Sequence, residues 1–200
     1  MFKKSKDKEE FENLLVQTRR KEKIKKEHID GKWVVKTLIL AFVISFSLSF
    51  VSQMTIPNLS VLLGILVTLI FILIGILFDI IGVAVTSADE KVFHSMNSRK
   101  VKGANVAVLF KKNAEKVSSF CNDVIGDICG VISGSAGVTI ANSVSSAFSF
   151  SAFWTGLVIT AIIAAFTIGG KALGKSFAIN KSNLILYEFA KFISNFYKKK

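Results

Sequence analysis

The residues best placed for chemistry are carboxylates set inside long apolar segments. Asp79 lies six residues before the end of the apolar run 61–85, and Asp127 lies seven residues after the start of the run 120–147. On two antiparallel helices both would lie about 10 Å from the same membrane boundary, so they can meet. A carboxylate at that depth is costly unless it is paired, protonated or neutralised, and we expect no Lys or Arg at this level. We therefore predict a bound hard cation, or a proton, between Asp79 and Asp127.

Further oxygen atoms extend this predicted site along both helices. Asp123 lies one turn from Asp127 on the same face, and Gly82 and Thr86 continue the face of Asp79. Carboxylate, hydroxyl, amide and backbone oxygens are the ligands that Mg²⁺ and Ca²⁺ prefer. The predicted metal ligands are Asp79, Asp127, Asp123, Gly82, Thr86 and Asn122.

The third apolar run also carries glycines at four-residue intervals, Gly126, Gly130 and Gly134. This is the small-xxx-small pattern that brings membrane helices close together. Helix packing is the interpretation we favour for these glycines, and exposure of backbone carbonyls to a cation is the alternative.

Long apolar segments must position these residues. Hydrophobic residues make up 51% of the chain and Pro occurs once, which suits long uninterrupted helices. Roughly 20 apolar residues cross the hydrocarbon of a bilayer. The sequence therefore predicts an all-α integral membrane protein with four transmembrane helices, followed by a juxtamembrane helix at 176–197; the spans are 34–53, 61–85, 120–147 and 150–170.

Basic residues set the expected orientation. Of the 26 Lys and Arg residues, 11 lie in residues 1–33, and most others lie in 89–119 or after residue 170. The loops 54–60 and 142–149 carry no charge. The positive-inside rule then predicts both termini in the cytoplasm of a multi-pass plasma membrane protein. Attraction to anionic lipid headgroups is a secondary effect, and the dispersed basic residues do not favour nucleic-acid binding.

The first 33 residues form a separate basic cytoplasmic segment. Residues 7–27 have apolar positions at helical spacing, and we favour a solvated or membrane-surface helix over one that binds a partner protein. The domain organisation we expect is segment 1–33, an additional span 34–53 and a transmembrane domain 61–197.

Other chemistries are weakly represented. Residues 169–176 match the phosphate-binding pattern G-x-x-x-x-G-K-[ST], but a membrane helix precedes them where that geometry needs a buried strand, so we predict no nucleotide cofactor. No nucleophile and base pair suggests an enzyme. Cys121 and Cys129 lie about 12 Å apart along one helix, too far for a disulfide.

From Asp79 onward the chain resembles the transmembrane domain of the CNNM/CorC magnesium transporters. The resemblance rests on the run Ala84-Val85-Thr86-Ser87-Ala88-Asp89, a basic helix, a Gly-Asp-containing span and a last span that leads into a Lys-containing juxtamembrane helix. It covers roughly 61–197. Aligned on these motifs, the family's metal-site serine falls at Asp79, its acidic position at Gly82, and its two asparagines at Asp127 and Val131.

The resemblance implies Mg²⁺ transport by a homodimer. Two features depart from the family. Its Glu-x-x-Pro-Lys element appears as Lys171-Ala172-Leu173-Gly174-Lys175, which keeps the final Lys alone, and the paired CBS domains do not follow. The alternative function is a non-transporting membrane scaffold that retains the fold.

Overall fold

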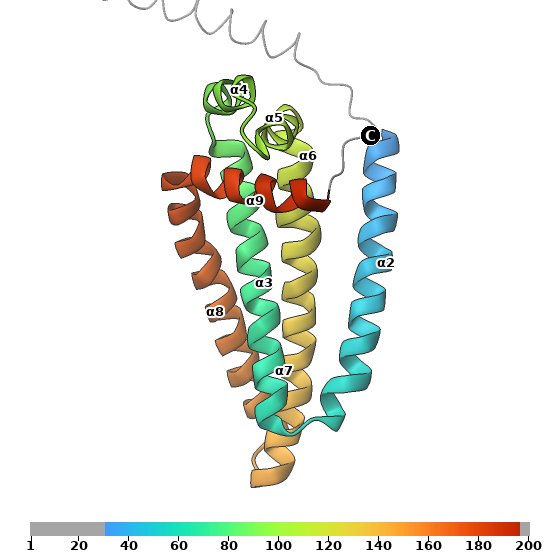
Figure 1. Ribbon diagram of the computed structural model, residues 1–200. Helices are drawn as coiled ribbons and strands as arrows, with labels where there is room; N and C mark the ends of the chain where they lie inside the picture. The colour runs from blue at the N-terminus through green and yellow to red at the C-terminus, as the bar shows by residue number, and fades with distance from the viewer. Residues whose placement is uncertain (1–30, 197–200) are drawn as a thin grey trace, which may run out of the picture. The chain divides into compact units, whose positions relative to one another are not determined.

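The computed structural model describes residues 31–196, which are almost entirely helical. The chain divides into two units, residues 1–36 and 37–200. The predicted helix at 7–27 lies outside the described residues. The elements, drawn in Figure 1, are α2 (Gly31–Thr55), η1 (Ile56–Asn58), α3 (Val61–Ser87), α4 (Glu90–Ser98), α5 (Ala104–Lys112), α6 (Ala114–Ser119), η2 (Phe120–Gly126), α7 (Asp127–Phe148), α8 (Ala152–Asn180) and α9 (Ser182–Phe196).

Four helical stretches are long and apolar enough to cross a membrane, which confirms the predicted all-helical class and its four apolar helices. They are α2, α3, the continuous stretch Ala114–Phe148, and α8. The predicted end of the third span at 147 agrees with α7, which continues to Phe148, where Ser149 turns the chain with a positive φ of 54°. The uncharged loop expected to start at residue 142 was wrong, because residues 142–148 are helical.

The fourth span was also expected to end at residue 170. Instead α8 continues through Lys171 and Lys175 to Asn180, because Lys is a good helix former and a charge does not by itself end a helix. The juxtamembrane helix α9 consequently begins at Ser182 rather than at residue 176.

Glycines bring α3, α7 and α8 close together. A Cβ atom on Gly75 would lie 3.1 Å from Cβ of Cys129, and one on Gly174 would lie 2.8 Å from Cγ1 of Ile80. The predicted glycine face behaves differently: a Cβ on Gly130 or Gly134 would meet no atom within 4 Å. Glycines therefore do bring these helices together. The glycines that pack closely include Gly75 and Gly174, whereas Gly130 and Gly134 of the predicted pattern do not.

At one end of α3 the short helices form a second packed layer. Phe93 of α4, Val106 of α5 and Leu186 of α9 are buried in one cluster with Val85 of α3. Gly103 immediately precedes α5 with φ of 87°, and a Cβ there would lie 2.8 Å from Cα of a residue on α9. Figure 1 shows α9 crossing the ends of the long helices, beneath α4 and α5.

A lysine from this layer caps α3. Nζ of Lys111 donates hydrogen bonds to the carbonyls of Val85 (3.1 Å) and Thr86 (2.6 Å). Terminal carbonyls of a helix have no partner within the helix and carry its partial negative charge, so an ammonium group is well suited to them. This contact fixes the end of α3 that carries the candidate site residues.

Candidate cation site

Asp79 is the buried carboxylate of the long helices. Asp79 is 4% exposed, and it lies on the face of α3 that also carries the buried glycines Gly75 and Gly82. Oδ2 of Asp79 is buried and has no hydrogen-bond partner among the described residues. A buried polar atom without a partner costs free energy, and this cost is greatest for an ionised group.

A second unpartnered acceptor faces α3 from the neighbouring helix. Oδ1 of Asn122 is buried without a hydrogen-bond partner among residues 31–196, while its Nδ2 lies 3.4 Å from Oγ of Ser118. A Cβ on Gly82 would lie 2.6 Å from Cγ of Asn122. The missing side chain at residue 82 is therefore what makes room for the Asn122 amide against α3.

The backbone around Asn122 is unusual. Residues Phe120–Gly126 form a π-helical turn between α6 and α7. Such turns are rare, and they are found mostly inside α-helices and frequently at functional sites. This irregular turn sets the direction of Asn122 relative to the regular helix that follows it.

The contacts along α3 place Asp79 and Asn122 at neighbouring levels along the axis of that helix. Gly82 contacts Asn122, and Gly75 contacts Cys129 with its Cβ position 3.5 Å from the Gly126 carbonyl. Asp79 lies between Gly82 and Gly75 on the same face, so it lies beside the π-helical turn, one helical turn from Asn122. Two acceptor oxygens thus share a buried region in which the described residues supply neither oxygen with a donor.

Asp127 has different surroundings. It lies at a similar height to Asp79, but its side chain is 73% exposed and its Oδ1 is 3.5 Å from Nζ of Lys171. The expectation that no basic residue is available at this level was therefore wrong. It failed because α8 continues past residue 170 and carries Lys171 to the level of Asp127. The structure does not bring Asp79 and Asp127 into one buried site.

Asp123 and Thr86 also have partners of their own. Asp123 is exposed, and its carboxylate accepts a hydrogen bond from Oγ of Ser119. Thr86 donates its hydroxyl to the Val83 carbonyl at 2.9 Å, and its own carbonyl accepts from Lys111. Of the six predicted ligands, the structure groups Asp79, Gly82 and Asn122.

Within residues 31–196 no cluster of three or more His, Cys, Asp or Glu side chains could hold a metal ion, so amide or backbone oxygens must complete a cation site.

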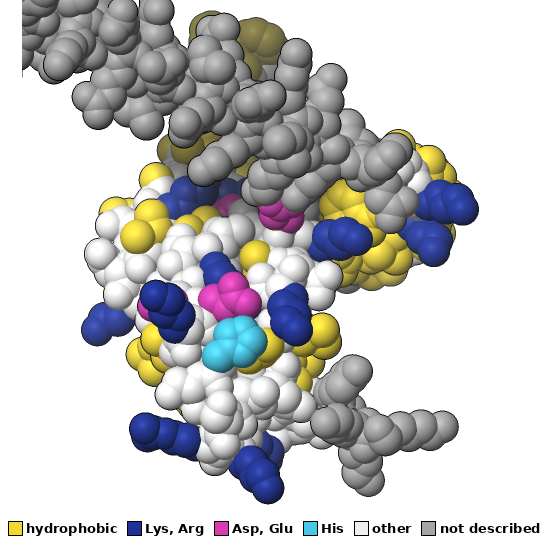
Figure 2. All heavy atoms as spheres, turned by 90° about the horizontal axis from the view of Figure 1, so that it is seen from above, with side chains coloured by type: hydrophobic (Ala, Val, Ile, Leu, Met, Phe, Trp, Pro, Cys, Tyr) yellow, Lys and Arg dark blue, Asp and Glu magenta, His cyan; other side chains and the backbone are white. Residues whose placement is uncertain are grey.

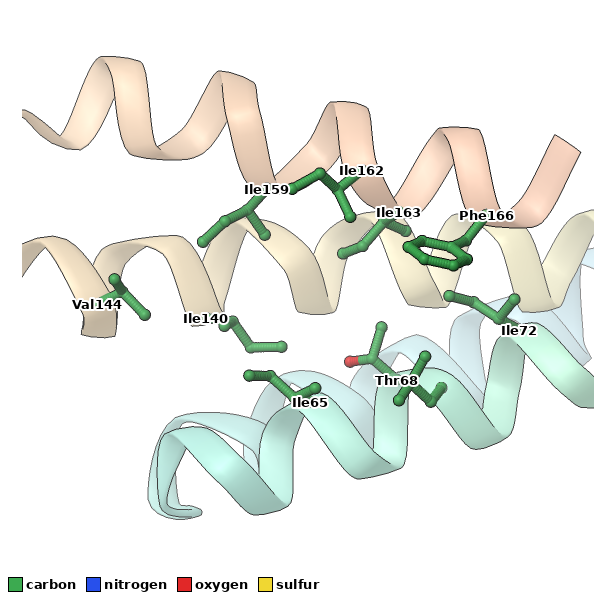
Figure 3. Close-up of a pocket in the computed structure, with 10 residues that line it drawn as sticks. Ile65, Thr68, Ile72, Ile140, Val144, Ile159, Ile162, Ile163 and Phe166 are labelled. Carbon is green, nitrogen blue, oxygen red and sulfur yellow. The ribbon is translucent and has the colours of Figure 1, made fainter. Parts of the chain in front are cut away.

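Two other features do not form polar sites. Residues 169–176, which match the phosphate-binding pattern, lie inside α8, where the backbone amides donate hydrogen bonds along the helix instead of forming a phosphate loop. A cavity of about 370 Å³ between α3, α7 and α8 is lined by apolar side chains and Thr68 (Figure 3). The Thr68 hydroxyl donates to the Gly64 carbonyl, so this cavity offers hydrocarbon rather than ion ligands.

Two lysines near the site were missed by sequence reasoning. Lys171 was read as the end of a span, although the apolar residues Leu173, Phe177 and Ile179 after it show that the helical pattern continues. Lys111 gave no local signal, because its contact with α3 joins residues 25 and 26 positions apart.

The chain matches no family model, no curated protein and no solved structure. The similarity to CNNM/CorC transporters therefore stays a prediction from the sequence.

Proposed function

We propose that this chain is an integral membrane protein of the CNNM/CorC type that binds and transports a divalent cation, Mg²⁺, through Asp79 and Asn122. The observation that carries the proposal is the pair of buried acceptor oxygens, Asp79 Oδ2 and Asn122 Oδ1, for which no described residue supplies a donor. Both are hard oxygen ligands of the kind that Mg²⁺ accepts, with water completing its shell. The role is non-enzymatic, with neither nucleotide nor nucleic acid involved.

The placement of charge supports one orientation in the membrane. The basic residues of 91–116 lie on α4 to α6 and their turns, at the end of α3 that α9 also contacts. Figure 2 looks onto this end and shows Lys and Arg side chains around it with few acidic ones. We propose that this face is cytoplasmic in the plasma membrane, close to anionic headgroups, with both termini on the same side.

The experiment is a calorimetric Mg²⁺ titration of the purified protein and of two matched variants. Asp79→Asn removes the buried charge and should abolish binding, whereas Asp123→Asn removes an exposed, Ser119-bonded carboxylate nearby and should weaken binding far less. Binding should also stabilise the parent by about 2.7 kcal/mol at a hundredfold excess over the dissociation constant. If the parent shows neither heat nor stabilisation at millimolar Mg²⁺, Asp79 holds a proton and the transport proposal is wrong.

A second function, association through α7, is favoured by the composition of its exposed face. The other long helices expose large apolar side chains such as Leu73 and Phe166, as lipid-facing helices do. The exposed face of α7 carries Asp127 and Val131, with the half-buried glycines Gly130 and Gly134 beside them, where a Cβ would meet no atom within 4 Å. A charge and small residues on one face suit a protein partner better than lipid.

We propose that a second copy of this chain covers the α7 face, because Asp127 of α7 and the neighbouring Lys171 of α8 give this side of the molecule both signs of charge for a two-fold contact. Gly134→Leu should then convert a dimer in lipid nanodiscs to a monomer. Gly169→Leu, at an equally open glycine on α8, should leave the dimer intact. A monomeric parent would overturn the homodimer proposal while leaving the cation site untouched.

A further inference from the structure

Lys171 is a basic residue of α8 that lies near the candidate cation site. Its side chain is 21% exposed, and Nζ lies 3.4 Å from the position that a Cβ on Gly126 would occupy. Gly126 in turn contacts Gly75, which lies one turn from Asp79 on α3. The ammonium group therefore lies within roughly 13 Å of Asp79, given 3.9 Å between the Gly126 Cβ position and the Gly75 carbonyl and about 6 Å for one turn of helix.

The backbone holds Lys171 in this position. A Cβ on Gly170 would lie 3.1 Å from Cγ1 of Ile76, and Gly174 makes a similar approach to Ile80. Ile76 and Ile80 flank Asp79 in the sequence of α3. The two glycines thus fix α8 against the segment of α3 that carries the buried carboxylate, and Lys171 lies between them on α8.

The charge of Lys171 is only partly offset. Its one ion pair within the described residues is with Asp127 at 3.5 Å, and that carboxylate is 73% exposed. Lys171 and Asp79 are not within ion-pair distance, so the ammonium group does not satisfy the orphaned Oδ2 atom. It can still repel a cation that binds there.

We propose that Lys171 is a tethered cation that sets the charge selectivity of the Asp79–Asn122 site by weakening divalent binding more than monovalent binding. This inference rests on the proposed function. The repulsion is proportional to the charge of the bound ion, so its free energy for a divalent ion is twice that for a monovalent ion at the same place. When the Lys171 charge is removed, the fold-change in the dissociation constant of Mg²⁺ should therefore be the square of the fold-change in that of Na⁺, whatever the local dielectric constant.

The test compares Mg²⁺ and Na⁺ titrations of the full chain in detergent. At an effective dielectric constant near 20, Lys171→Gln should tighten Na⁺ binding roughly tenfold and Mg²⁺ binding roughly a hundredfold. Lys171→Arg keeps the charge and should match the parent. Lys175→Gln removes an exposed lysine one turn along α8 and should change either affinity far less. Asp127→Asn removes a carboxylate from the same region and should weaken the binding of both ions, that of Mg²⁺ again by the square.

The possible results separate this inference from the proposed function. If Asp79→Asn abolishes Mg²⁺ binding but Lys171→Gln leaves it unchanged, or changes both ions equally, the site stands and the role of Lys171 is wrong. If neither the parent nor Lys171→Gln binds either ion, the proposed site itself is wrong and the inference goes with it. If Lys171→Gln does not fold, Lys171→Met takes its place in the same comparison, since equal changes in the binding of the two ions would contradict a charge effect.

Discussion

Gly82→Ala tests whether Asn122 is held in the candidate site by the absence of a side chain on α3. The added methyl group would lie 2.6 Å from Cγ of Asn122 and 3.0 Å from its Nδ2, and closer still to Oδ1. These separations are far below van der Waals contact, so the amide group must move or the helices must separate. Either movement takes Oδ1 of Asn122 away from its present position beside Asp79.

Two opposing terms set the stability of this variant. Alanine is favoured over glycine inside a helix by about 1 kcal/mol, while overpacking a close contact costs about 1–3 kcal/mol. We expect a net loss of up to about 2 kcal/mol together with a loss of Mg²⁺ binding, because the site loses its neutral oxygen ligand. Gly169→Ala is the matched control, since a Cβ there meets nothing within 4 Å and should give the helix gain alone.

The assay is thermal unfolding in detergent with and without Mg²⁺, followed by calorimetric titration of the variants that fold. The decisive comparison is the Mg²⁺-dependent shift in melting temperature, which should disappear for Gly82→Ala and persist for Gly169→Ala. A Gly82→Ala protein with the parent's stability and the parent's Mg²⁺ affinity would refute the reasoning. It would show that the Asn122 amide has room to move and takes no part in binding.

Two further predictions concern the end of α3 and the orientation of the chain. Lys111→Met should destabilise the protein by about 1 kcal/mol, because it leaves the Val85 and Thr86 carbonyls uncapped, whereas Lys112→Met at the exposed neighbour should not, as measured by thermal unfolding. In intact cells, with Cys121 and Cys129 replaced by Ala, single cysteines at Asn58 and Ser151 should react with an impermeant thiol reagent, and one at Ser5 should not. Labelling at Ser5 from outside would contradict cytoplasmic termini.

The apolar segments could be predicted because their physics is local. A run of about 20 uncharged residues needs no knowledge of its neighbours to be identified as a candidate span. The ends of the helices were less predictable. Residue 170 was chosen as an end because a charge follows it, but α8 depends on packing of Gly170 and Gly174 against α3, which no local pattern reports.

The candidate site was predictable in part for the same reason. Asp79 was identified from its depth and Gly82 from the helix face that it shares with Asp79, and the structure groups both with the predicted ligand Asn122. The sequence could not show which face of α7 Asp127 occupies, because the π-helical turn at Phe120–Gly126 changes the helical register just before it. The long-range contacts of Lys171 and Lys111 could not be predicted, because hydrophobic periodicity gives no information on contacts between distant parts of the chain.

The burial of Asp79 is the strongest reason to expect a function for this region. A leucine or alanine at residue 79 would pack against α7 without the desolvation cost of a carboxylate, so stability alone does not account for the aspartate. The nearest lysines do not offset that cost, since Lys111 is bound to the end of α3 and Lys171 is paired with Asp127. A proton and a cation are two ways to satisfy Asp79 Oδ2, and they differ in a measurable way. A protonated Asp79 makes Asp79→Asn nearly isosteric and neutral in stability at every Mg²⁺ concentration, whereas a cation site makes the difference between the two proteins grow with the logarithm of Mg²⁺ concentration above the dissociation constant.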